Sequence, residues 1–80
     1  MATDYELAKA AAINAVNAAS EMTKSKHRNA AKAARLSSQV WDAFGRCECF
    51  GDMGDTAKEA EARQEAERLA DKVFELEEEA

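Results

Sequence analysis

Proline is absent from this 80-residue chain, and glycine occurs only at positions 45, 51 and 54. These two residue types are the usual helix breakers, so their scarcity leaves one strong interruption, the segment 45–55. A chain of this length has room for one domain. We therefore expect residues 1–80 to form a single all-α domain, built as a three-helix bundle or a long helical hairpin.

Long apolar runs are also missing. No stretch reaches the roughly 18 residues that a membrane-spanning helix needs, and the first residues, MATDYELAK, lack the basic and apolar regions of a signal peptide. The net charge of −5 leaves no surplus of lysine and arginine for contacts with phosphates. These features predict a cytoplasmic protein that binds neither membranes nor nucleic acid directly.

Only two cysteines and one histidine are present, Cys47, Cys49 and His27. A structural zinc site takes four ligands, commonly in two spaced pairs, so this set falls short. A thiolate also needs positive surroundings, whereas Glu48 lies between the two cysteines. We interpret them as reduced thiols in a turn. The alternatives are a metal site, including one completed across a dimer, and an intermolecular disulfide.

Helix boundaries are marked by capping residues. Thr3 and Glu6 form a capping box that starts a helix over 4–23, and Thr56 and Glu59 form another that starts a helix over 56–78.

Between these two helices, apolar residues repeat every three or four positions on both sides of the polar stretch SEMTKSKHRN. One continuous helix over 4–44 would explain the shared register, but it would be too elongated to cover its own core. We therefore favour a break at a Thr23 or Ser25 cap, with a second helix over 26–44.

The segment 45–55 is expected to be an interhelical loop. Gly45 would end the second helix in a left-handed cap. The other two glycines would allow the turns before the third helix, and Phe44, Phe50 and Met53 would close the end of the hairpin.

Bulky apolar residues are few and much of the apolar content is alanine, so one chain buries little area. Small domains with thin cores often depend on association. An alanine-lined seam on the first helix is the expected contact of a homo-oligomer, a dimer in the first instance. Its members are Ala8, Ala12, Ala15, Ala19 and Met22.

Charge is distributed unevenly. Residues 24–35 carry cations and no acid, and we name this set the basic segment: Lys24, Lys26, Arg28, Lys32 and Arg35. In an antiparallel hairpin it would lie beside the acidic end of the third helix, and the two would neutralise each other. Opposite charges three or four residues apart, such as Glu59 with Arg63 and Glu65 with Arg68, should pair within that helix.

Six carboxylates of the third helix are candidates for binding a basic surface of a protein partner. They are Glu61, Glu65, Glu67, Asp71, Glu75 and Glu78. No catalytic or cofactor motif is found, so we expect neither enzymatic activity nor a cofactor.

In overall profile the chain is short, acidic, alanine-rich and helical, and it resembles small phage-encoded inhibitors such as anti-CRISPR proteins. The resemblance implies a binding protein that blocks a macromolecular machine, and it assigns a role to no particular residue. Two alternatives stay open: an assembly protein that forms a helical homo-oligomer, and a metal-bound regulator that uses Cys47 and Cys49.

Overall fold

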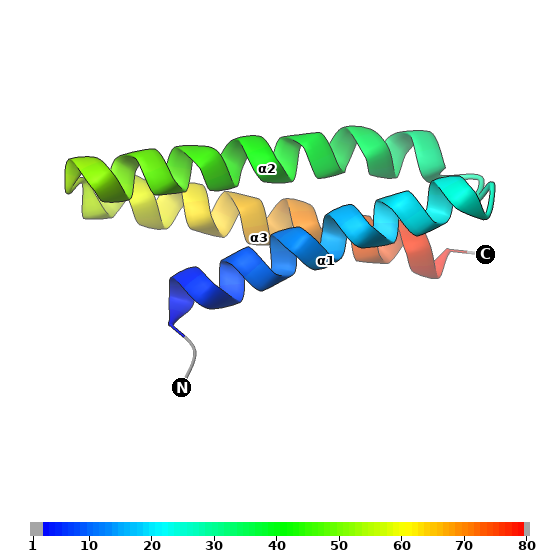
Figure 1. Cartoon of the computed structure of the whole chain (residues 1–80), viewed down its shortest axis with the longest axis horizontal. Helices are drawn as coiled ribbons and strands as arrows, with labels where there is room; N and C mark the ends of the chain where they lie inside the picture. The colour runs from blue at the N-terminus through cyan, green and yellow to red at the C-terminus, as the bar shows by residue number, and fades with distance from the viewer. Residues whose placement is uncertain (1–2, 80) are drawn as a thin grey trace.

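Three helices follow one another along the chain in the computed structural model, which describes residues 3–79. Helix α1 spans Asp4–Lys24, α2 spans Ala30–Met53 and α3 spans Thr56–Glu78. Helices α1 and α3 run in one direction and α2 runs in the other (Figure 1). The predicted all-α three-helix bundle is confirmed, and so is the break between the first two helices.

The start of α1 follows the sequence prediction. Thr3 is the N-cap, and its hydroxyl accepts a hydrogen bond from the Glu6 amide at 3.1 Å. The same hydroxyl donates to the Glu6 carboxylate at 3.3 Å. One of the free amides of the first turn is thereby satisfied within the chain.

The turn between α1 and α2 is made without glycine. Ser25 caps the end of α1, and Lys26 adopts a left-handed conformation with φ 58°. The sequence predicted that this helix starts at residue 26, but helix α2 begins at Ala30. The reason is this left-handed residue, because a right-handed helix cannot run through it.

At the other end of α2, the structure corrects the predicted loop 45–55. Helix α2 continues through Gly45 to Met53, and the helix-ending glycine is Gly54, with φ 79°. The Gly54 amide donates to the Gly51 carbonyl and the Asp55 amide to the Phe50 carbonyl, which is the Schellman arrangement. Only Gly54 and Asp55 therefore separate α2 from α3.

The helix passes through Gly45 because its neighbours Phe44 and Cys47 lie on one face and are both buried, at 2% and 1% exposure. Their burial offsets the roughly 1 kcal/mol that glycine costs inside a helix.

The cap of α3 also differs from the prediction. Asp55, not Thr56, is the N-cap, and its carboxylate accepts a hydrogen bond from the Lys58 amide at 3.1 Å.

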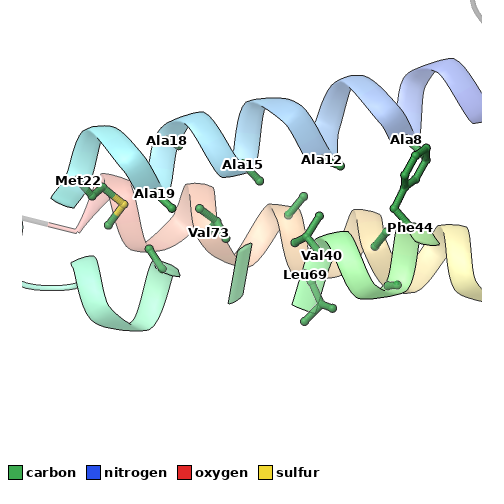
Figure 2. Packing of buried hydrophobic residues seen from close by; sticks show 14 residues of the cluster. Ala8, Ala12, Ala15, Ala18, Ala19, Met22, Val40, Phe44, Leu69 and Val73 are labelled. Atoms are coloured by element: carbon green, nitrogen blue, oxygen red, sulfur yellow. The ribbon is translucent and has the colours of Figure 1, made fainter. Parts of the chain in front are cut away.

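The predicted alanine seam of α1 lies inside the single chain. Its members, Ala8, Ala12, Ala15, Ala19 and Met22, are at most 3% exposed. Figure 2 shows α1 facing Val40 and Phe44 of α2 and Val73 of α3. The prediction that this seam meets a second chain is wrong, because alanines let three helices of one chain approach closely enough to bury it.

Self-association itself stays a prediction. Among residues 3–79, the large apolar side chains left exposed are Tyr5, Leu7, Ile13, Trp41 and Met53. Over residues 3–79, no helix combines the length and apolar character needed to cross a membrane.

Candidate functional site

Four carboxylates form a line along one face of α3: Glu67, Asp71, Glu75 and Glu78. We call this line the acidic row. Its members are three or four residues apart, a spacing that stacks side chains on one helix face at about 5–6 Å. All four are exposed, whereas the buried side of α3 is made of Ala62, Ala66, Leu69, Ala70 and Val73.

The acidic row is not neutralised by direct contact within the described chain. Over residues 3–79, ion pairs shorter than 4.0 Å join Arg63 to Asp4 and Glu59, and Arg68 to Glu65. None of them includes a carboxylate of the row. The structure thus places four of the six predicted partner-binding residues together on an open face.

Glu61 and Glu65, the other two candidates, lie apart from the row. The Arg68 guanidinium donates to Glu65 at 2.6 and 3.3 Å, and this hydrogen bonding lowers the pKa of the Glu65 carboxyl. Glu61 lines a shallow groove of about 360 Å³ together with Arg46 and Lys58. Cations of the protein itself therefore surround these two acids.

The basic segment starts beside the acidic end of α3, as an antiparallel hairpin requires, and Lys32 and Arg35 share a groove with Glu75 and Glu79. Direct neutralisation is not observed, because the ion pairs within residues 3–79 include no member of the basic segment. Of the pairs predicted within α3, Glu59 with Arg63 and Glu65 with Arg68 are present, whereas Lys58 with Glu61 and Lys72 with Glu75 are not among the ion pairs of residues 3–79.

At the opposite end of the bundle, α2 and α3 extend past the first residue of α1 (Figure 1). A groove of about 570 Å³ lies at this junction. In it, the Cys47 thiol donates to Glu59 at 3.3 Å, and Arg63 binds the same carboxylate at 2.8 Å. Tyr5 donates to Glu48 at 2.8 Å, and this hydrogen bond to a carboxylate raises the pKa of the phenol.

Burial, together with the hydrogen bond to Glu59, raises the pKa of the Cys47 thiol to about 11. The thiol therefore stays protonated near neutral pH and is a poor nucleophile and a poor metal ligand. Cys49 is exposed on another face of α2, and His27 lies in the turn at the far end of that helix. The three residues do not converge, and over residues 3–79 no group of three or more histidine, cysteine or acidic side chains is placed to hold a metal ion.

Sequence reasoning did not predict the contacts that join residues far apart in the chain, among them the hydrogen bond of Cys47 to Glu59 and three others. Tyr5 reaches Glu48, Arg63 reaches Asp4 at 3.8 Å, and Asn29 reaches the end of α3. For Asn29 a partial signal existed, since asparagine commonly precedes a helix. Its side chain, however, makes no cap and binds α3 instead.

No family model, curated protein or solved structure matches this chain. Its activity is therefore inferred from its own residues.

Proposed function

We propose that the protein is a non-enzymatic binding module that uses the acidic row of α3 to engage a basic surface on a partner protein. The observation that carries this proposal is the set of four exposed carboxylates, Glu67, Asp71, Glu75 and Glu78, which have no ion-pair partner among residues 3–79.

The row is electrostatically unfavourable in the isolated chain. Like charges four residues apart, such as Glu67 with Asp71 and Asp71 with Glu75, destabilise a helix by about 0.2–0.5 kcal/mol each. Glu78 adds a negative charge at the negative end of the helix dipole. A partner that brings lysine or arginine to the row would remove this repulsion. The repulsion that remains in the free folded chain is therefore relieved on binding, which favours the complex.

Complementary charge would also set the rate and the specificity of the encounter. Opposite charges accelerate association and like charges reject wrong partners, and both effects weaken with salt. The basic sites of nucleic-acid-processing proteins are surfaces of the required kind, because they bind phosphates through lysine and arginine. The protein would act as an inhibitor by occupying such a site.

The experiment is affinity capture from a lysate at low ionic strength, followed by mass spectrometry and by a direct binding measurement with the recovered protein. The test variant is Glu67→Lys with Asp71→Lys. The matched control is Glu21→Lys with Asp42→Lys, which changes net charge equally at exposed positions on α1 and α2.

The proposal expects a partner with a basic surface whose affinity falls with added salt. That affinity should drop in the acidic-row variant and persist in the control. Equal loss in both variants would show that only net charge matters, and the proposal would then be wrong. Capture of a partner whose binding is indifferent to salt and to both variants would also contradict it.

A further inference from the structure

A second candidate site lies between α2 and α3, where several cations that form no ion pair with the acidic row lie close together. A shallow groove of about 430 Å³ lies between the first half of α2 and the last turns of α3, and we call it the basic groove. Lys32, Arg35 and Gln39 of α2 line one wall, and Lys72 of α3 lines the other. Three cations of a chain that is acidic overall therefore lie together at this groove.

These cations are available to a ligand. Lys32, Arg35 and Lys72 are all exposed, and the ion pairs found over residues 3–79 include none of them. Two acids, Glu75 and Glu79, also line the α3 wall. Glu79 accepts a hydrogen bond from the Asn29 amide at 2.8 Å, and neither acid forms an ion pair within residues 3–79, so they do not neutralise the cations by contact.

Between the charged walls the groove has an apolar floor. Leu36 and Leu76 are half-buried, and both pack against the core from its edge. An aliphatic side chain placed between them would bury apolar surface, which favours a complex. The groove therefore combines two kinds of attraction, a positive wall and an apolar floor.

We propose that the basic groove is a second docking site, which receives an acidic, leucine-bearing helix of a partner protein as a fourth helix beside α2 and α3. The furrow between two packed helices accepts a third along their length, and amphipathic helices bind such grooves through apolar residues at three and four spacing. Leucine side chains would lie on Leu36 and Leu76, and carboxylates would face Lys32 and Arg35.

Charge also orients this helix. Glu75 and Glu79 repel carboxylates from the α3 wall, so the acidic edge of the incoming helix turns toward α2. A nucleic acid fits less well, because the floor offers leucine in place of aromatic rings for stacking, and Glu75 of the acidic row lines the groove itself.

The probe is a synthetic helical peptide of about 14 residues, about 21 Å long, with leucine at three and four spacing and glutamate elsewhere. Its binding to the full chain is measured by fluorescence anisotropy. Two companion peptides separate the two attractions: one replaces glutamate by lysine, and the other replaces leucine by alanine. We expect the leucine–glutamate peptide to bind and both companions to bind at least about tenfold more weakly.

The test variant is Lys32→Glu with Arg35→Glu, which should weaken peptide binding at least about tenfold. Its matched control, Lys9→Glu with Lys58→Glu, makes the same charge change at exposed positions outside this groove and should bind as the wild type does. Circular dichroism checks that each variant folds. If the double variant does not fold, Lys32→Gln with Arg35→Gln removes the same two cations without adding acids and tests the same wall, with a smaller expected loss.

Three results would overturn the proposal. The peptide could bind both charge variants equally, which would place it elsewhere. A single-stranded oligonucleotide could bind more tightly than the peptide and lose affinity in the Lys32→Glu, Arg35→Glu variant, which would make the site one for phosphates. Sedimentation could reveal a dimer that this variant dissolves, in which case the occupant is a second copy of the chain.

Discussion

The end of α2 offers a direct test of the fold through two alanine substitutions, Gly45→Ala and Gly54→Ala. Gly45 lies inside the helix, and a Cβ atom added there would meet nothing within 4 Å. Alanine is favoured over glycine in a helix interior by about 1 kcal/mol. For a domain of this size, that gain corresponds to a rise of about 4–8 °C in the melting temperature.

Gly54→Ala has the opposite expected sign. Gly54 holds φ at 79°, a left-handed conformation that costs an alanine about 1–2 kcal/mol. Both substitutions reduce the conformational freedom of the unfolded chain equally, so that contribution cancels when the two variants are compared. The two free energies of unfolding should therefore differ by roughly 1–2 kcal/mol, which is the left-handed strain of an alanine at position 54.

Urea and thermal unfolding followed by far-ultraviolet circular dichroism measure both variants against the wild type. If α2 ended at Gly45 in a left-handed cap, the signs would be exchanged, with Gly45→Ala destabilising the protein and Gly54→Ala tolerated. That result would refute the continuous helix through Gly45 and restore the loop 45–55.

Three further predictions concern single side chains. Asn29→Ala removes two hydrogen bonds to the end of α3, so it should lower the free energy of unfolding by about 1–3 kcal/mol in urea titrations, and an equal stability would show that the contact is not formed. At pH 8 a thiol reagent should modify Cys49 quickly and Cys47 only on unfolding. Folding raises the pKa of Cys47 from 9.0 to about 11, so the thiol loses its proton at a lower pH in the unfolded state than in the folded state. The contribution of this thiol to the free energy of unfolding should therefore fall as the pH rises from about 9 toward 11. The Cys47→Ala variant should not show this fall. Lys26→Gly relieves the left-handed strain at φ 58° and should stabilise the protein by up to about 1 kcal/mol, whereas Lys26→Ala should not.

The core explains why a chain with few bulky residues closes on itself. Alanines of α1 bring its backbone close to both other helices, so Val40, Phe44 and Val73 become almost fully buried without help from a second chain. Phe44 also meets two exposed aromatic rings: its ring centroid lies 5.3 Å from that of Tyr5 and 6.0 Å from that of Trp41. Because alanine side chains are small, the three helices pack closely, and this close packing compensates for the small apolar area that each alanine buries.

Features that depend on neighbours along the chain followed from the sequence by itself. The Thr3 cap of α1 and the ion pair of Glu65 with Arg68 each join residues one helical turn apart, and the buried positions from Ala8 to Met22 repeat about once per turn. Such interactions are set by helix geometry and need no knowledge of the fold. The three-helix architecture followed from the same local patterns.

Tertiary structure decided the rest, because the energies concerned come from distant residues. Whether Gly45 or Gly54 ends α2 depends on the packing of Phe44 and Cys47, which outweighs the local preference of glycine to stop a helix. Asn29 binds α3 some 47 residues away in place of capping its own helix. The sequence also did not predict which carboxylates of α3 form no ion pair. That depends on where the cations of α1 and α2 lie relative to α3 in the folded chain.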